Sequence, residues 1–230
     1  MKLLAIDTSS VACSVALQVD AEVLERHEEQ AREHTRLLMP MVRAVLNEAS
    51  VTTEQLDAIV LGNGPGSFIG MRIAASVAQG IAHGAGIPIV PVSSLAAVAA
   101  QAFDETGASE IVVAQDAHMN EVYLGAFRQG PEGVPVPLFA ERLQTQTPID
   151  DLDPASASAR ASAGFGWERY PGLAAVNDPL IGAHSTVKYP RARFLLPIGR
   201  AALANGTEIR PQDLVPAYLR SKVAAIPSQN

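Results

Sequence analysis

The chain has 230 residues with 48% apolar side chains, which fits one large folded domain or two small lobes and excludes wholesale disorder. Its formal net charge of −7 arises in the first 110 residues, which hold 6 Lys/Arg and 13 Asp/Glu, so this half is not expected to bind nucleic acid by itself. One cysteine, Cys13, excludes an internal disulfide framework, and no apolar stretch approaches the ~20 residues of a membrane span, so we expect a cytoplasmic protein without a membrane partner.

The N-terminal segment predicts a meander of three strands. An apolar run at 3–6 is typical of a buried strand, residues 13–19 alternate loosely, and residues 23–27 form a third extended stretch after a tight reversal. The first turn of this meander carries three polar residues, Asp7, Thr8 and Ser9.

A helix is expected next, from about Thr35, a plausible N-cap, to Ala49. Pro40 conflicts with so early a start because a proline inside a helix removes a hydrogen bond, so a start nearer Leu37 or a kink is the alternative. The apolar residues of this segment cover more than one face of the helix. That is wider than a single core contact needs and implies a second buried surface.

A glycine-rich loop over residues 62–70 joins a short apolar strand at 58–61 to a helix at 68–83. Such a loop directs backbone N–H groups at one spot and suits either an anion or close backbone packing. It lacks the Lys-Ser or Lys-Thr of a Walker loop, and its glycines at every second position do not match a dinucleotide fingerprint. We therefore favour packing and partner docking over a catalytic cradle.

The helix after this loop has two faces to bury. Small residues spaced four apart form one ridge, which another helix could approach closely, and branched residues with the same spacing form a second face. The small residues are Gly70, Ala74, Ala78 and Ala82, and the branched ones are Ile73, Val77 and Ile81.

The second half of the chain partly repeats the first. A strand at 111–116 that ends in Asp116, a turn, and a strand at 121–127 echo the first strand, the turn at Asp7 and the strand after it, which indicates two related lobes. Before this repeat, a strand is expected at 89–92 and a helix that begins at a capping Ser94. After it, we expect a loop at 150–164, a helix at 197–205 and an extended segment at 216–220.

This order of elements predicts an α/β protein with mixed sheets. It matches the ribonuclease-H-like core of the actin and sugar-kinase superfamily (the ASKHA fold), in which two such lobes enclose a cleft. The expected lobes are residues 1–105 and a smaller, reduced lobe at 106–230.

With these elements placed, the chain resembles the bacterial TsaB (YeaZ) family over most of its length. Five segments carry the resemblance, in order: 4–9 (Leu-Ala-Ile-Asp-Thr-Ser), 33–40 (Glu-His-Thr-x-x-Leu-x-Pro), 64–73 (Gly-Pro-Gly-Ser-Phe-x-Gly-x-Arg-Ile), 116–123 (Asp-Ala-x-x-x-Glu-Val-Tyr) and 216–220 (Pro-x-Tyr-Leu-Arg). Ile69 and His118 depart from the family pattern, in which a small polar residue and an arginine are common.

The resemblance implies a role in making threonylcarbamoyladenosine beside the anticodon of tRNA. Members act as a non-catalytic partner of a TsaD-type transferase, with a TsaE-type ATPase as third component. The chain is therefore expected to contact tRNA only as part of this complex. ATP and metal are expected in the partner or the complex, and no cofactor in this chain. The transferase paralogue has a His-x-x-x-His metal pair, and Ser94 and Val98 stand at the matching positions here, so no catalytic or metal-binding residue is expected.

The two helices with excess apolar surface carry the interface prediction. Their spare faces are expected to pack on an equivalent pair of the partner, or on a second copy when the partner is absent. The predicted interface residues are His34, Leu38, Met41, Val45, Gly70, Met71, Ala74, Val77 and Ala78.

Two enzymatic alternatives remain open at this point. A small ATPase or phosphotransferase would use the turn Asp7-Thr8-Ser9 to hold a magnesium phosphate, although we favour a structural turn. A metallopeptidase is disfavoured because the histidines are scattered. His34 is interpreted as an interface or capping residue rather than a general base, and Cys13 as a core thiol rather than a nucleophile.

Overall fold

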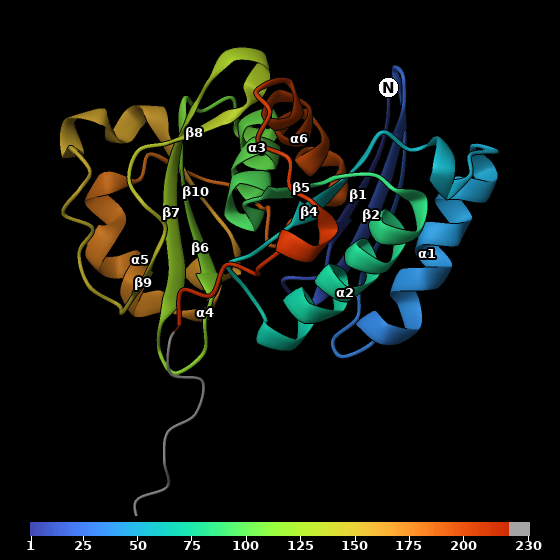
Figure 1. Ribbon diagram of the computed structural model, residues 1–230. Helices are drawn as coiled ribbons and strands as arrows, with labels where there is room; N and C mark the ends of the chain where they lie inside the picture. Colours follow the sequence, from blue (N-terminus) through green and yellow to red (C-terminus); the bar gives the residue numbers. More distant parts are fainter. Residues whose placement is uncertain (221–230) are drawn as a thin grey trace, which may run out of the picture.

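The computed structural model describes residues 1–220, which form two β-sheets with helices around and between them (Figure 1). The strands are β1 (Lys2–Asp7), β2 (Ala12–Val19), β3 (Glu22–Glu29), β4 (Ala58–Gly62), β5 (Ile89–Val92), β6 (Glu110–Asp116), β7 (Val122–Gln129), β8 (Pro135–Pro137), β9 (Arg142–Gln144), β10 (Arg160–Ala163) and β11 (Ala183–His184). The α-helices are α1 (His34–Glu48), α2 (Phe68–Ala85), α3 (Ser94–Thr106), α4 (Phe165–Arg169), α5 (Pro171–Asn177) and α6 (Leu195–Ala204).

The two sheets share one connectivity. The first has the order β3-β2-β1-β4-β5, with β1–β2 and β2–β3 antiparallel and β1–β4 and β4–β5 parallel. The second, β8-β7-β6-β10-β11, repeats this pattern, with β6–β7 and β7–β8 antiparallel and β6–β10 and β10–β11 parallel. The predicted relation between the lobes and the mixed α/β fold are confirmed. The second lobe is reduced, since β8, β10 and β11 have only 3, 4 and 2 residues.

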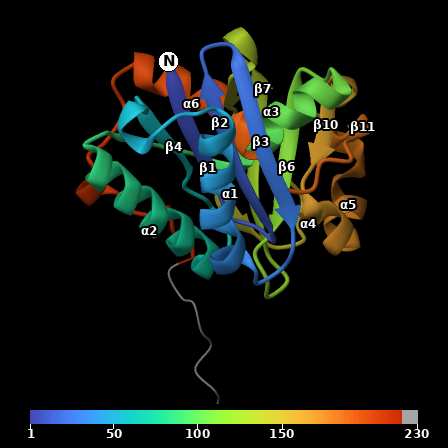
Figure 2. The ribbon, with the colours of Figure 1, turned by 90° about the vertical axis from the view of Figure 1, so that its right-hand side faces the viewer.

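Helices cover both faces of each sheet. α1 and α2 lie side by side on one face of the first sheet (Figure 2), over a core that includes Ile6, Val15 and Leu61. α6 covers the opposite face of that sheet, and α4 and α5 cover the outer face of the second sheet. The alanine-rich α3 lies between the sheets, with Ala97 against the first and Phe103 in the core of the second. Small side chains let one helix serve both lobes.

The predicted division at residues 105 and 106 needs a correction. β6 to β11 do form the second sheet, but the chain then returns to the first lobe. Ala192, Leu195 and Leu196 are at most 2% exposed and pack against Leu3 and Val60 of the first sheet. Assigning all of 106–230 to the second lobe is therefore wrong for the segment that contains α6.

Several predicted helix boundaries also change. α1 begins at His34, so Thr35 lies inside it, and Pro40 is accommodated within the helix on its exposed side. The cap of α3 is Ser93, whose Oγ accepts from the N–H of Ala96 at 3.0 Å, and not Ser94. α6 begins at Leu195, two residues before the expected start, and Gly206 follows its end with φ +67°.

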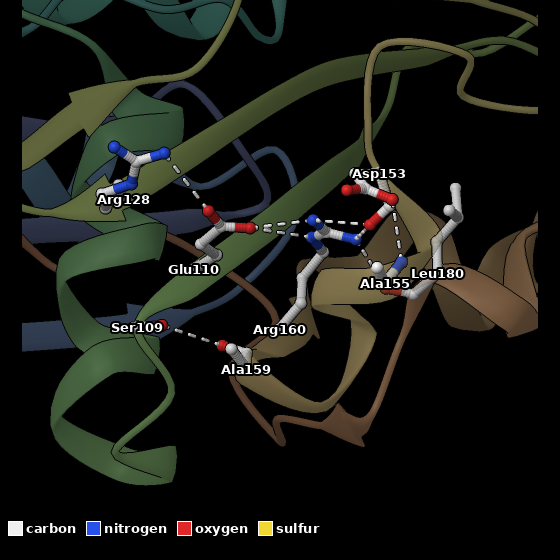
Figure 3. Close-up of polar contacts among 8 residues, drawn as sticks. All are labelled: Ser109, Glu110, Arg128, Asp153, Ala155, Ala159, Arg160 and Leu180. Atoms are coloured by element: carbon white, nitrogen blue, oxygen red, sulfur yellow. Dashed lines mark hydrogen bonds and ion pairs between the residues drawn. The ribbon is translucent and has the colours of Figure 1, made fainter.

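The segment 150–164, expected to be a loop, contains a 3-10 helix (Pro154–Ala159) and the strand β10. The buried Arg160 holds it in place (Figure 3). Its guanidinium donates to the Glu110 carboxylate at 2.8 and 3.2 Å and to the Leu180 carbonyl at 3.0 Å. One buried cation thus ties β6, β10 and the chain before β11 together.

None of the helices in residues 1–220 combines the length and apolar character needed to cross a membrane.

Candidate functional site: the interlobe cleft and an exposed helix pair

The turn after β1 is closed by its own hydrogen bonds. Asp7 is 1% exposed, and its Oδ1 accepts from the N–H and the hydroxyl of Ser9, both at 2.8 Å. Its Oδ2 accepts from Ser94 Oγ at 2.7 Å, and that hydroxyl in turn accepts from the N–H of Gly64 at 3.2 Å. Thr8 Oγ1 donates to the Gly70 carbonyl at 2.7 Å. The turn therefore joins β1, the glycine loop and α3.

The glycine loop packs directly on this turn. A Cβ on Gly66 would lie 2.2 Å from the Ser9 carbonyl oxygen, and one on Gly70 would lie 1.9 Å from that of Thr8. The loop N–H of Ser67 donates to Ser9 O at 2.6 Å. Glycine is required here because backbone meets backbone. Close packing on the turn therefore explains why this loop is rich in glycine.

These contacts do not fit a magnesium phosphate, which the fold family places at this turn. Both Asp7 oxygens already have donors, and a cation would need lone pairs that are free and accessible. Burial raises the pKa of Asp7 above its usual value, with the bonds from Ser94 and Ser9 opposing the rise.

A cleft of about 820 Å³ lies between the lobes. Its walls include Ser9, Ser67 and His34 from the first lobe and Asp116 and Tyr123 from the second. Its size suits a small ligand, and its lining mixes apolar and polar groups from both lobes.

The turn after β6 is the counterpart of the turn at Asp7. Asp116 Oδ1 accepts from the N–H of His118 at 2.8 Å and from the Tyr170 hydroxyl at 2.7 Å. Burial, together with the bond to Asp116, raises the pKa of Tyr170 to about 12. His118, Met119 and Asn120 have φ of 60°, 54° and 61°. Three consecutive left-handed residues are unfavourable for L-amino acids, so neighbouring groups must hold this turn.

Residues 214–220, here called the strap, supply part of that support. Leu214 is buried in the first-lobe core, and the N–H of Ala217 donates to the Asn63 carbonyl at 3.1 Å. At the other end, Arg220 forms an ion pair with Glu121 at 2.6 Å and donates to the Ala117 carbonyl at 2.9 Å. The strap runs between the lobes without joining either sheet. It includes the 216–220 segment expected to be extended.

His34 and Cys13, the two other candidate residues, are both buried. His34 is 8% exposed with Nε2 at 3.0 Å from the Ser10 carbonyl oxygen, so this nitrogen donates to the backbone. Cys13 is fully buried, and burial raises the pKa of its thiol to about 12, as suits the predicted core thiol. Within residues 1–220, no group of three or more His, Cys, Asp or Glu side chains could hold a metal ion.

The predicted partner interface lies mostly in the core of the protomer. Of its residues, only Val77 is partly exposed; the other eight are buried. Ala74 and Ala78 are 0% exposed and pack against the first sheet. The prediction that these small residues form a spare face is therefore wrong. Periodicity defined the ridge correctly, but it could not say which ridge faces the sheet.

The outward surface of the helix pair is different. A groove of about 380 Å³ between α1 and α2 is lined by Thr35, Leu38, Met39, Ile69, Arg72, Ile73, Ser76 and Val77. Ile69 is 70% exposed, the largest exposed fraction, shared with Val215, among the exposed large apolar side chains of residues 1–220. Gly80 and Gly84 continue this side of α2 with open space around them. The second apolar surface implied by the helix composition thus exists; of the predicted interface residues, Leu38 and Val77 line it, and the rest of its lining was not predicted.

Comparisons with known proteins agree on one family. A family model described as TsaD, tRNA N6-adenosine threonylcarbamoyltransferase, matches residues 23–136. The tRNA threonylcarbamoyladenosine biosynthesis protein TsaB of Escherichia coli is 34% identical over 97% of this chain and 96% of its own length. The chain belongs to the TsaB family. The TsaB protein of Haemophilus influenzae is also 34% identical, over 97% of this chain and 95% of its own.

Solved structures bear out the TsaB fold. YeaZ from Pseudomonas aeruginosa has a TM-score of 0.82 and 35% identity over 95% of this chain and 99% of its own. A second Pseudomonas aeruginosa structure, described as an uncharacterized protein with similarity to peptidase YEAZ, reaches 0.85 at 36% identity, with the same coverage. The predicted family and the ASKHA-like fold are confirmed.

Proposed function

We propose that this TsaB-family protein is a non-catalytic partner subunit that binds and activates a TsaD-type transferase, which threonylcarbamoylates the tRNA adenosine next to the anticodon. Membership in a family whose Escherichia coli member is named for this biosynthesis supports the proposal. A TsaE-type ATPase is the third component, tRNA is reached only through the complex, and the location is cytoplasmic. ATP and metal belong to the partner or the complex.

The observation that carries the docking role is the exposed groove between α1 and α2. Ile69, Ile73 and Val77 leave apolar surface beside it that nothing within residues 1–220 covers. The TsaD family model matches this chain from residue 23 to 136, a range that includes both helices. A transferase of related fold would present an equivalent helix pair, and the two pairs would pack as four helices. The same groove would support a homodimer when the transferase is absent.

The turn at Asp7 supports the proposal that this chain has no catalytic role of its own. Its carboxylate is buried, and both of its oxygens accept hydrogen bonds from Ser9 and Ser94. A group that cannot reach substrate cannot act as acid, base or ligand.

Reconstituted tRNA threonylcarbamoylation tests the proposal. The transferase, the ATPase component, ATP and threonylcarbamoyl-adenylate are supplied, and this chain is titrated in. Activity should depend on the chain, and Ile69→Glu should lower it by about tenfold or more because a carboxylate enters an apolar contact. Val176→Glu is the matched control, since Val176 is 44% exposed on α5 of the other lobe. Full activity without the chain, or equal loss in both variants, would contradict the proposal.

The interlobe cleft favours one second candidate, a small ATPase or phosphotransferase. Its volume of about 820 Å³ is sufficient for a nucleotide. ATP turnover by the purified chain, abolished by Asp7→Asn in a variant that stays folded, would support this alternative over the docking subunit.

A further inference from the structure

The helix pair that forms the groove differs in charge from the rest of its lobe. Residues 1–110 hold 6 Lys/Arg and 13 Asp/Glu. Three of those cations lie on the two helices, Arg36 and Arg43 on α1 and Arg72 on α2. α2 contains no acidic residue, and Glu48 is the only one in α1. An acidic lobe therefore carries one basic, apolar face.

The two carboxylates of α1 and of the residue before it already form ion pairs. Glu48 pairs with Arg26 of β3, and Glu33, which precedes α1, pairs with Arg36. Among residues 1–220, no carboxylate lies within ion-pair distance of Arg43 or Arg72. Both cations are thus uncompensated within the part of the chain that the structure describes.

Arg72 lines the groove and is held in position there. Its Nε donates to the Tyr218 hydroxyl at 3.0 Å, and its guanidinium carbon lies 3.7 Å from the centre of the Phe68 ring. The bond and the stacking orient the guanidinium before any partner arrives. Its two terminal nitrogens make no hydrogen bond within residues 1–220. A planar donor pair of this kind matches a carboxylate in bidentate geometry.

A second copy of this chain does not supply that carboxylate. In a two-fold dimer the same face meets itself, so Arg43 and Arg72 of each copy approach a surface whose acidic residues are already paired. The uncompensated cations would then be partly desolvated on a face that offers no unpaired carboxylate, which is unfavourable. A partner that carries a carboxylate beside an apolar helix ridge would instead gain an ion pair.

We infer that Arg72 determines the specificity of the docking face: it selects a transferase subunit that presents a carboxylate opposite it, and it disfavours self-association of this chain. The inference rests on the proposed function, because it names the chemistry that the transferase must present. Arg43, four residues after Met39 on α1, adds to the positive electrostatic potential of the docking face. Specificity of this kind combines one attractive and one repulsive contact.

One substitution should move the two associations in opposite directions. Arg72→Gln removes the charge and leaves a shorter, polar side chain that can still form hydrogen bonds. We expect the dissociation constant for the transferase to rise by about tenfold or more, as for loss of a close interfacial charge pair, and self-association to become tighter. Arg169→Gln on α4 of the second lobe is the control for net charge and should change neither. Both constants are measured by analytical ultracentrifugation.

Salt provides a second, independent readout. Raising the salt from about 50 mM to about 500 mM should weaken the complex with the transferase, because it screens an attraction, and should tighten the homodimer, because it screens a repulsion. In Arg72→Gln both dependences should become shallower.

The outcomes separate this inference from the proposed function. If the wild-type chain does not bind the transferase at any salt concentration, the proposed function fails. If it binds, and Arg72→Gln binds as tightly with the same salt dependence, the proposed function stands and the inference about Arg72 is overturned. If no self-association is measurable in either protein, the transferase measurement decides alone.

Discussion

At the scale of single residues, Asp7 shows how a polar turn is held by its own hydrogen bonds. In the turn Asp7-Thr8-Ser9, the carboxylate accepts three hydrogen bonds from Ser9 and Ser94 while only 1% exposed. Buried polar groups of this kind are costly to leave unpaired, so the network fixes the relative positions of β1, the glycine loop and α3. The sequence pattern alone resembles a phosphate site because the same residue types serve both purposes.

The raised pKa of Asp7 leads to a pH prediction. The folded state holds this proton more tightly than the unfolded state, so the carboxyl contributes stability below its unfolded pKa of about 3.8 and loses it as pH rises through the folded value. Asn does not titrate, so the Asp7→Asn variant does not lose this stability as pH rises. The unfolding free energy of the wild type, minus that of the variant, should therefore fall as pH rises above about 4.

Urea denaturation at a series of pH values measures that difference. A difference that grows with pH would show that the hydrogen bonds to the carboxylate outweigh its burial, and the direction assigned to the pKa would be wrong.

At the scale of elements, the structure distinguishes two faces of α2 that the sequence treated alike. Ala74 and Ala78 face the sheet and are fully buried, whereas Ser76 lines the groove between α1 and α2. Residues on either face of a helix recur with the same helical spacing, so only the position of α2 on the sheet shows which face is buried.

A matched pair of substitutions tests this assignment. Ala74→Arg should lower the free energy of unfolding by about 3 kcal/mol or more, because a long charged side chain enters a packed core. Ser76→Arg should change it by no more than about 0.5 kcal/mol, while it blocks transferase binding at the groove. Urea denaturation and a binding assay measure both effects. A folded Ala74→Arg monomer that cannot dimerise would instead restore the ridge of small residues as the interface.

Arg160 permits a similar comparison within the second lobe. It shares Glu110 with Arg128, but the side chain of Arg160 is 2% exposed and that of Arg128 is 62% exposed. Arg160→Met should therefore destabilise the protein by about 3 to 5 kcal/mol, since it leaves Glu110 and the Leu180 carbonyl without a buried donor. Arg128→Met should cost less than about 1 kcal/mol. Equal losses in urea denaturation would mean that burial does not govern the strength of these pairs.

At the scale of the whole molecule, two lobes with one strand connectivity are joined by α3 and by the strap. α3 contributes side chains to the cores of both lobes, and the strap connects them again at the far end of the chain through Arg220. The turn at His118 to Asn120, beside the cleft, therefore contacts a residue about 100 positions away in the sequence.

Removing Arg220 should loosen that turn. Arg220→Ala deletes the ion pair to Glu121 and the bond to the Ala117 carbonyl, which hold a left-handed segment in place. Amide hydrogen exchange of residues 117–121 should become about tenfold faster, while α1 stays unchanged. Arg210→Ala, which removes an exposed pair with Asp213, is the control. Unchanged exchange at 117–121 would show that the turn is stable without the strap.

The sequence by itself determined the order of strands and α-helices up to about residue 127, the repeat of strand, Asp-bearing turn and strand, and the family. These are local signals: apolar runs, turn residues and short motifs at fixed spacing. It also indicated that α1 and α2 have more apolar surface than one core needs, and the groove at Ile69 bears this out.

Tertiary structure alone decided which surfaces are free. The return of α6 to the first lobe, the role of Ser94 in binding Asp7, and the burial of Ala74 all depend on contacts between residues distant in the chain. A helical pattern states that two residues share a face but not what that face meets, and a polar motif lists donors and acceptors but not their partners. Burial and pairing are properties of the assembled layers, so the docking face could be named only after the helices were placed on their sheet.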